Sequence, residues 1–302
     1  MRKHPVIAGI LLLLLVGVCS FLLIYGIAGK AGMGDVFSGG ERVGIVLVRG
    51  VLADARETIS QIDEFTNDDR VRAVVLRVES PGGGVVAAQE IYARVRKLRA
   101  TKTVVASLGS VAASGGYYIA CAAERIVANP GTVTGSIGVI LQFPRFEELF
   151  RKVGIGTTTI KSGAYKDMGS PFRGVTPAER EFLQGVTNDI YMQFVDVVLT
   201  SRNLPPERTA EIAEGKIFTG KQAQAMGLVD DLGGESDAVE IAARIAGMEG
   251  KPAVVYAKQK RTGVLRYLLE ESARFLAEEF QEAAPGGVEY RMAPGLPGEI
   301  AD

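Results

Sequence analysis

Hydrophobic and polar positions alternate along the chain with two different periods, which predict strands separated by helices. Residues 58–69 and 85–98 carry apolar side chains every three or four positions, as helices with one buried face do. Short apolar runs rich in β-branched residues are typical of buried strands, and they stand at 43–49, 71–78, 104–107 and 127–128. Strands and helices that alternate at this spacing indicate βαβ units in a mostly parallel sheet, and therefore an α/β fold.

The later part of the chain contains two helix starts that the sequence marks clearly. Residues 176–179, Thr-Pro-Ala-Glu, form a capping box with proline at the first helical position, and apolar positions continue the helix to Val198. A second capping box at 219–222 begins a short helix that ends near Gly227. Residues 261–281 have the pattern of an amphipathic helix, which lies on a membrane, binds a partner or packs on its own domain.

An uncharged segment, residues 5–29, precedes all of these elements. It exceeds the roughly 20 apolar residues that a helix needs to cross a bilayer. Arg2, Lys3 and His4 stand before it, so the positive-inside tendency directs the N-terminus to the cytoplasm. A cleaved signal peptide is the competing interpretation, but its apolar region is usually shorter, and residues 28–31 match a cleavage site only weakly. We therefore expect one uncleaved transmembrane anchor.

The composition restricts the chemistry more than the fold. The 302-residue chain contains a single histidine, His4, which stands before the apolar segment. A Ser-His-Asp triad, a Cys-His dyad and a histidine-ligated zinc site are therefore excluded from the folded domain, and we expect no metal and no cofactor. Cys19 and Cys121 are poorly placed to pair, so no disulfide framework is expected. A net charge of −1 without a polybasic run gives no reason to expect nucleic acid as a partner.

A serine between small residues is the first candidate for chemistry. Ser114 lies in the string VAASGGYY at 111–118, where two glycines follow it. A nucleophilic serine at a strand-to-helix turn needs small neighbours so that a substrate can approach, and the next backbone N–H can stabilise an oxyanion. A second glycine-rich turn at 82–84 can supply another donor. Taken alone, the string is weak evidence and is more typical of a tight, close-packed turn.

A lysine in a later loop is the candidate base. Residues 161–167 read KSGAYKD and include Lys166. A lysine accepts a proton near neutral pH only if its pKa falls by roughly 3 from about 10.4, and burial of the ammonium group can supply such a change. A hydroxyl acceptor would position the amine, and Ser136 in the string TGSIG at 134–138 is a candidate. The alternative for any single lysine is an ordinary solvated charge.

These residues stand in strings that resemble a known family, signal peptide peptidase A, in its short single-domain form. The strings follow the family's order, and the resemblance extends over residues 43–245. They are SPGGGV at 80–85, GSVAASGGYYIA at 109–120, TGSIGV at 134–139, IKSGAYKDMGSP at 160–171 and TGKQAQAMGLVDDLGG at 219–234. The resemblance implies a membrane-bound serine protease with a Clp-protease/crotonase-like fold of repeated ββα/βαβ units, preceded by one transmembrane helix.

The resemblance also implies a role for each matching residue. Ser114 takes the position of the family's nucleophile, and Lys166 takes that of its general base. Ser136 takes the position of the serine that holds the lysine amine. The backbone N–H groups of Gly83 and Gly115 take the positions of the oxyanion donors.

Substrates, partners and location follow from the same resemblance. The family cleaves remnant signal peptides in the membrane, with small and apolar residues preferred near the cut. It forms ring- or dome-shaped homo-oligomers such as octamers, in which serine and lysine can come from adjacent subunits. The implied location is the bacterial inner (plasma) membrane, with a single pass, a cytoplasmic N-terminus and an extracytoplasmic protease domain. One departure is Glu79, where the family usually has Asn or Asp, and we expect no effect because the backbone position is what matters there.

These inferences divide the chain into segments with different roles. They are a cytoplasmic tail at 1–4, the transmembrane anchor at 5–29, a flexible tether at 30–41, the protease domain at 42–250, an amphipathic helical extension at 251–283 and a disordered tail at 284–302. The tether is expected to be flexible because it is rich in glycine. The tail is expected to be disordered because proline and glycine are frequent in it.

Other functions remain open from the sequence. A protease of the same superfamily that is specific for stomatin-like membrane proteins uses a similar Ser-Lys pair, although the string at 160–171 favours signal peptide peptidase A. A crotonase-like acyl-CoA enzyme shares glycine-rich oxyanion turns, but it generally works through Glu or Asp and needs no serine nucleophile. A non-catalytic membrane scaffold is disfavoured because both Ser114 and Lys166 are present.

Overall fold

A computed structural model of the chain describes residues 16–18, 40–258 and 287–291. The chain divides into two compact units, Met1–Glu41 and Arg42–Asp302, and all the elements named below belong to the second. Within the described residues, no helix is both long and apolar enough to cross a membrane. The anchor predicted at 5–29 lies outside these residues except for 16–18, and so it stays a prediction.

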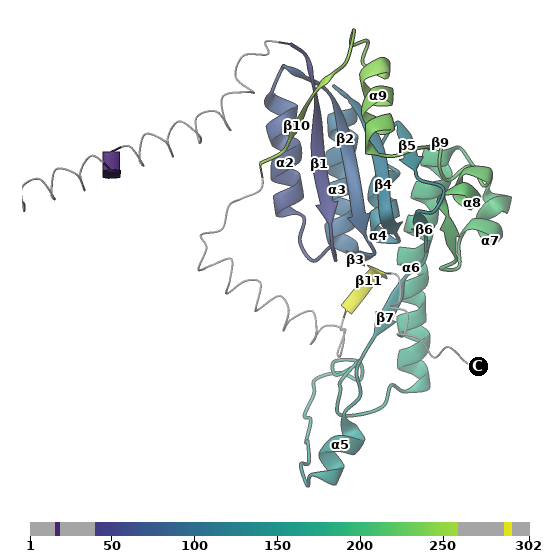
Figure 1. Ribbon diagram of the computed structural model, residues 1–302. Coiled ribbons are helices and arrows are strands. Elements are labelled where there is room, and N and C mark those ends of the chain that lie inside the picture. Colours follow the sequence, from purple (N-terminus) through teal and green to yellow (C-terminus); the bar gives the residue numbers. More distant parts are fainter. Residues whose placement is uncertain (1–15, 19–39, 259–286, 292–302) are drawn as a thin grey trace, which may run out of the picture. The chain divides into compact units, whose positions relative to one another are not determined.

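A mostly parallel sheet forms the centre of the second unit (Figure 1). Its strands lie in the order β10-β1-β2-β4-β5-β9, and every neighbouring pair in that order is parallel. Their bounds are β1 (Arg42–Arg49), β2 (Val71–Ser80), β4 (Thr103–Ala113), β5 (Arg125–Ala128), β9 (Asp231–Leu232) and β10 (Ala253–Tyr256). β1, β2 and β4 are rich in buried apolar residues because helices cover both faces of a parallel sheet.

The helices divide between the two faces of this sheet. They are α2 (Arg56–Asn67), α3 (Val85–Arg99), α4 (Gly115–Ala120) and α9 (Glu235–Ile245). The first three pack on one face, together with Leu76 and Val78 of β2, whereas α9 packs on the other face with Ala73 and Val75 of the same strand. Because successive residues of a strand point to opposite faces and both faces are covered, β2 has an unbroken apolar run at 73–76 and does not alternate between apolar and polar residues there.

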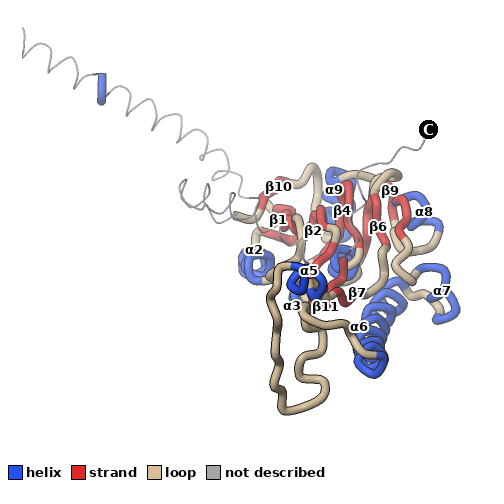
Figure 2. Tube along the Cα trace, turned by 90° about the horizontal axis from the view of Figure 1, so that it is seen from below, coloured by secondary structure: helices blue, strands red, loops and turns tan. Residues whose placement is uncertain are grey.

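A long excursion leaves the sheet after β4 and β5. Its elements are β6 (Val133–Gly135), β7 (Ile140–Gln142), α5 (Glu147–Lys152), α6 (Pro177–Arg202) and β8 (Ile217–Thr219). β6 is parallel to β4 and antiparallel to β8, so it stays attached to the sheet. Residues 140–176, which we call the arm, project away from the sheet in Figures 1 and 2.

Short elements complete the second unit. They are β3 (Gly82–Gly84), η1 (Pro206–Arg208), α7 (Thr209–Ile212), α8 (Gly220–Ala225) and β11 (Gly287–Arg291). β3 and β7 both pair antiparallel with β11, which joins the glycine-rich turn after β2 to the beginning of the arm. This small sheet therefore lies at the same end of the molecule as the carboxyl ends of the central strands.

Most of the predicted elements are confirmed. The strands predicted at 43–49 and 71–78 are β1 and β2, and the helices predicted at 58–69 and 85–98 are α2 and α3. Both capping boxes are present at the starts of α6 and α8. The strand predicted at 104–107 is longer than expected, because β4 continues to the candidate nucleophile.

The structure corrects the predicted C-terminal segments in two places. Ala253–Tyr256, assigned to a helical extension at 251–283, is strand β10, because its backbone pairs with the edge of β1. Gly287–Arg291, assigned to a disordered tail at 284–302, is strand β11, because it pairs with β3 and β7. The amphipathic helix predicted at 261–281 lies outside the described residues.

Candidate active site

Three strands end side by side at the carboxyl edge of the sheet, and a tight turn follows each of them. Ser80 at the end of β2 pairs with β4, and Ala113 at the end of β4 pairs with Gly135 at the end of β6. The glycine turn of β3 follows β2, whereas Ser114 follows β4 and Ser136 follows β6. Sites in α/β proteins form at the carboxyl ends of parallel strands, so chemistry is expected at these turns.

Ser114 combines burial, backbone strain and an unused hydroxyl. Its backbone angles are φ 51° and ψ −119°, which a residue with a side chain adopts only when its surroundings impose them. Its N–H donates to Gly135 O at 2.8 Å, and its carbonyl accepts from Tyr118 N–H at 2.9 Å. The residue is fully buried, and within the described part of the chain its Oγ has no hydrogen-bond partner. A buried hydroxyl without a partner costs about 1–3 kcal/mol, so the Ser114 side chain lowers the stability of the fold.

The glycines after Ser114 let α4 begin close to the end of β2. A Cβ on Gly116 would lie 2.8 Å from Ser80 O, closer than real Cβ atoms approach a neighbour. Gly115 is the first residue of α4, so its N–H has no acceptor within the helix. The turn therefore presents a backbone donor directly after the serine.

The second glycine turn is fixed by Leu52. Leu52 N–H donates to Gly82 O at 2.9 Å, and Gly84 N–H donates to Leu52 O at 2.8 Å. Gly83 lies between these bonds with φ +151°, and a Cβ there would lie 2.5 Å from Leu52 N. Only glycine fits both the angle and the space at position 83, so the turn requires Gly83.

Ser136 occupies the position across the β4–β6 pair from Ser114. The residues that precede the two serines, Ala113 and Gly135, are paired in the sheet. Ser136 also has a positive φ of 52°, is 6% exposed, and donates its N–H to Lys216 O at 2.7 Å. The fold thus brings the candidate nucleophile and the candidate lysine holder to neighbouring positions.

Lys166 lies on the arm, in a series of turns between α5 and α6. Its N–H donates to Gly163 O at 3.2 Å, and the following turn is closed by Met168 N–H and Tyr165 O at 3.1 Å. The Lys166 side chain is exposed. The sequence argument requires a buried amine beside Ser114, and the described chain does not provide one because the arm projects from the sheet (Figure 1).

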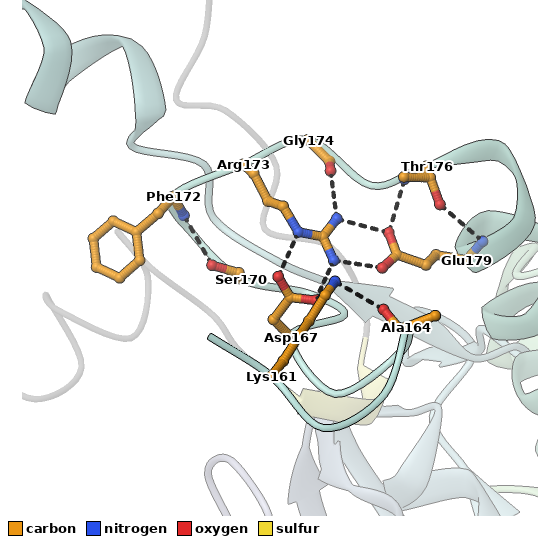
Figure 3. A network of polar contacts seen from close by, with 9 residues as sticks. All are labelled: Lys161, Ala164, Asp167, Ser170, Phe172, Arg173, Gly174, Thr176 and Glu179. Atoms are coloured by element: carbon orange, nitrogen blue, oxygen red, sulfur yellow. Dashed lines mark hydrogen bonds and ion pairs between the residues drawn. The ribbon is translucent and has the colours of Figure 1, made fainter. Parts of the chain in front are cut away.

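Sequence reasoning missed a cluster of charges at the base of the arm (Figure 3). Arg173 forms ion pairs with Asp167 and Glu179, and Lys161 also reaches Asp167. The capping box identifies Glu179 as a helix cap, but nothing in the sequence pattern indicates that it also binds an arginine. Contacts between turns leave no periodic signal, so only the structure could reveal this cluster.

Two other reactive side chains near the site are held in their neutral forms. Burial raises the pKa of the Cys121 thiol to about 11, so the thiolate is scarce at neutral pH. Burial also raises the pKa of Tyr117 well above its ordinary value, and its hydroxyl donates to Leu228 O at 2.7 Å. Of these three side chains, Ser114 is the one whose polar atom is buried without a hydrogen-bond partner among the described residues.

A strained, buried serine followed by backbone donors is an arrangement that a serine hydrolase can use, and the described domain contains no histidine to serve as its base. Comparison with known families makes the class specific. The chain matches the family model of peptidase family S49 over residues 96–249 and the model of Clp protease over residues 41–131. It belongs to peptidase family S49, and it is a serine protease with a mixed α/β fold of the Clp-protease type.

Individual relatives agree with this assignment. A protein of Synechocystis sp. whose name classes it as a protease is 44% identical over 210 residues, which cover 69% of this chain and 76% of the relative. A protein of Methanocaldococcus jannaschii, also classed by name as a protease, is 36% identical over 281 residues, covering 87% of this chain and 89% of the relative. The chloroplastic serine protease SPPA of Arabidopsis thaliana is 38% identical over 189 residues, covering 62% of this chain and 28% of the relative.

Proposed function

We propose that this protein is a membrane-anchored endopeptidase that cleaves remnant signal peptides, with Ser114 as nucleophile and Lys166 as general base. The observation that carries the proposal is the Ser114 hydroxyl, which is buried on strained backbone and has no partner among the described residues. A serine hydroxyl becomes nucleophilic only when a base removes its proton. The domain contains no histidine, so a lysine is the natural candidate.

The proposed reaction proceeds through an acyl-enzyme. Ser114 Oγ attacks the scissile carbonyl while its proton passes to the neutral Lys166 amine, and the N–H groups of Gly83 and Gly115 stabilise the oxyanion. The ammonium then gives this proton to the leaving amine, and the peptide C–N bond breaks. In the second half, Lys166 accepts a proton from water as the water attacks the ester. The ammonium then returns this proton to Ser114 Oγ while the ester bond breaks, which releases the acid product and restores the serine hydroxyl and the neutral amine. The Ser136 hydroxyl accepts a hydrogen bond from the amine and holds it in place.

Lys166 completes the dyad from a neighbouring subunit of a ring- or dome-shaped homo-oligomer. Two features support this part of the proposal: Lys166 is exposed on a projecting arm, and Ser114 Oγ lacks a partner among the described residues. Large apolar side chains on the arm and on α6 are also exposed, such as Leu149 at 56%, Ile160 at 96% and Phe182 at 53%. Clustered apolar exposure marks interaction surfaces, and burial of an amine at such an interface favours its neutral form.

The peptide substrate binds in an extended conformation along β3. β11 pairs antiparallel with β3 and places Tyr290 opposite Gly83, which supports the idea that this edge accepts an added strand. A substrate strand in a comparable position would bring its carbonyl groups to the glycine turn, while backbone pairing would leave specificity to small side-chain pockets. Small and apolar residues are therefore expected next to the cut.

The proposed location is the bacterial inner (plasma) membrane. Residues 5–29 would anchor the chain by a single span with its N-terminus in the cytoplasm and the protease domain on the other side. An anchored domain suits substrates that remain in the membrane after the proteins they directed have been released.

Active-site labelling tests the proposed function directly. The full-length protein is treated with a fluorophosphonate, digested and sequenced by mass spectrometry. We expect a single adduct on Ser114 in the native protein and no adduct in the Lys166→Ala variant, since the serine then has no base. Cleavage is followed in parallel with a signal peptide and with a stomatin-like protein as substrates. An adduct on another residue contradicts the dyad, and preferential cleavage of the stomatin-like protein favours the alternative protease class.

Replacing Gly83 by alanine is expected to reduce kcat by about 10²–10³-fold, which is the usual effect of removing one oxyanion donor. The added Cβ would meet Leu52 N at 2.5 Å, so the Gly83 peptide must turn and its N–H must leave the oxyanion position. The strained backbone is also expected to lower the free energy of unfolding by about 1–3 kcal/mol. Steady-state kinetics and chemical denaturation measure the two effects.

Gly84→Ala is the matched control for this variant. A Cβ on Gly84 would lie 3.3 Å from Leu52 O, and its φ of −58° suits any residue. We expect a much smaller loss of activity and stability. Equal effects of the two substitutions on kcat would show that the turn is merely crowded and that the Gly83 N–H has no special role.

A further inference from the structure

The base of the arm is held together by one arginine between two carboxylates (Figure 3). Arg173 Nε and Nη2 donate to the two oxygens of Asp167 at 2.8 and 2.6 Å. Arg173 Nη1 and Nη2 donate to the two oxygens of Glu179 at 2.8 and 2.5 Å. Arg173 Nη1 also donates to Gly174 O at 2.9 Å. These bonds use all the N–H groups of a guanidinium, which is the most that an arginine can make.

Glu179 makes this contact rigid because it belongs to the start of α6. Its Oε2 accepts from Thr176 N–H at 2.9 Å, and its own N–H donates to Thr176 Oγ1 at 3.3 Å, which is the capping box. Glu179 is only 3% exposed. Further along, α6 buries Phe194 and Val198 in the core. The arginine therefore connects the arm to a helix that is itself fixed to the protease domain.

Asp167 makes the contact relevant to catalysis because it directly follows Lys166. Lys161 Nζ donates to Asp167 Oδ1 at 2.5 Å and to Ala164 O at 2.9 Å, so the turn that carries Lys166 is also closed from its other side. A carboxylate held at both oxygens fixes its Cα, and with it the backbone from which the neighbouring side chain projects. The two cations and two carboxylates of the cluster have no net charge.

We infer that Arg173 is a positioning residue for Lys166: by binding Asp167 and Glu179 together, it sets the direction in which the Lys166 amine leaves the arm and prevents Asp167 from pairing with that amine. The inference rests on the proposed role of Lys166 as general base. Without Arg173, the Asp167 carboxylate is free to turn toward the adjacent ammonium, and such an ion pair stabilises the protonated form, which cannot act as a base. The turn also loses its link to α6.

The cluster itself does not titrate in the range where a lysine-dependent protease works. Hydrogen bonds from Arg173 lower the pKa of Glu179 to about 2. Hydrogen bonds from Arg173, and then from Lys161, hold the pKa of Asp167 well below its usual range. Groups with lowered pKa values contribute their full stabilisation above the unfolded pKa of about 4, and they lose it only as the pH falls toward the folded value. A change in the pH–rate profile above neutrality therefore reports on the dyad and not on these carboxylates.

The test compares Arg173→Ala and Arg173→Lys with Arg180→Ala in the full-length assembled protein. Lysine keeps the charge but cannot bind two carboxylates with paired bonds. Arg180 is an exposed arginine next to Glu179 on α6, so its removal controls for loss of charge at the same place. For both Arg173 variants we expect kcat to fall about 10–100-fold, as a displaced catalytic group does, with a smaller change in KM. The ascending limb of the pH–rate profile should move to higher pH, whereas Arg180→Ala should behave as the native protein.

Chemical rescue separates positioning from folding. Guanidinium ion added at low millimolar concentration should restore part of the activity of Arg173→Ala and none of the activity of Lys166→Ala. If both Arg173 variants keep the native kcat and pH–rate profile while Lys166→Ala is inactive, the inference is wrong and the proposed dyad stands. If Lys166→Ala stays active, the dyad itself is wrong. If the Arg173 variants lose activity with an unchanged pH–rate profile and without rescue, Arg173 only supports the fold, and the inference is also overturned.

Discussion

The Ser114→Ala variant is expected to lose peptidase activity by about 10⁴-fold or more, because a nucleophile that forms the acyl-enzyme has no substitute in the site. The loss should appear in kcat with signal-peptide substrates, while binding of a peptide aldehyde that requires the hydroxyl disappears. The structure adds an expectation about stability. The Ser114 hydroxyl is buried without a partner among the described residues, so removing it removes a desolvation cost.

Ser114→Ala should therefore unfold at the same temperature as the native protein or at a higher one. Replacing a residue that serves catalysis at a cost in stability leaves the unfolding temperature unchanged or raises it, whereas replacing a residue that serves packing lowers it. Ser110→Ala is the matched control, since Ser110 is an exposed serine on the same strand and should leave activity unchanged. Residual activity close to native in Ser114→Ala, or a large drop in its unfolding temperature, would contradict the assignment.

The core of the fold could be predicted from the sequence because its elements are set by local patterns. A parallel strand buried on both faces, such as β2, needs a continuous apolar run, and a helix that covers it must be apolar on one face, so both produce regular patterns in the sequence. The Ser114 turn could be predicted for a related reason. The close approach of α4 to Ser80 requires Gly116, and the turn at Leu52 requires Gly83. Because only glycine fits at these two positions, the turns can be recognised from the sequence.

The arm and the C-terminal strands could not be predicted in the same way. β10 is a four-residue strand whose identity depends on the free edge of β1, a partner about 200 residues earlier in the chain. The arm has few buried residues, so its apolar positions follow no period that reports an inner face. The position of Lys166 depends on the arm, and the contacts of Arg173 depend on two turns and a helix start. The position of Lys166 and the contacts of Arg173 are therefore determined by three-dimensional packing and not by the spacing of residues along the sequence.

The two halves of the proposed dyad are therefore of different kinds. Ser114 is built into the rigid carboxyl edge of the sheet, where paired strands impose its conformation. Lys166 is carried by a projecting segment, where a charge cluster fixes the turn on which it stands, and its side chain is exposed among the described residues. Among the described residues, the proposed nucleophile has no base beside it, and the proposed base is exposed on a segment that projects away from the sheet. Two copies of the same chain can satisfy both needs, as heterologous interfaces in a closed ring do.

Mixed assemblies of two inactive variants test this arrangement, and we expect them to recover activity. Ser114→Ala subunits keep Lys166, and Lys166→Ala subunits keep Ser114. If the lysine of one subunit serves the serine of the next, a random equal mixture has about one quarter of its sites intact, because half of the serines and half of the lysines are native. If both residues of a site come from one chain, no mixture can contain an intact site.

The experiment requires co-assembly and not simple mixing of finished rings. The two variants are co-expressed with different affinity tags, purified through both tags in sequence, and assayed with a signal peptide and with a fluorophosphonate probe. Labelling should appear only on the Lys166→Ala subunits, since they alone carry the serine. Co-assembly of Ser114→Ala with the double variant Ser114→Ala/Lys166→Ala is the control and should remain inactive. Doubly tagged assemblies of the two single variants that stay as inactive as this control would place serine and lysine in the same chain, and the arm would then have to fold back toward its own sheet.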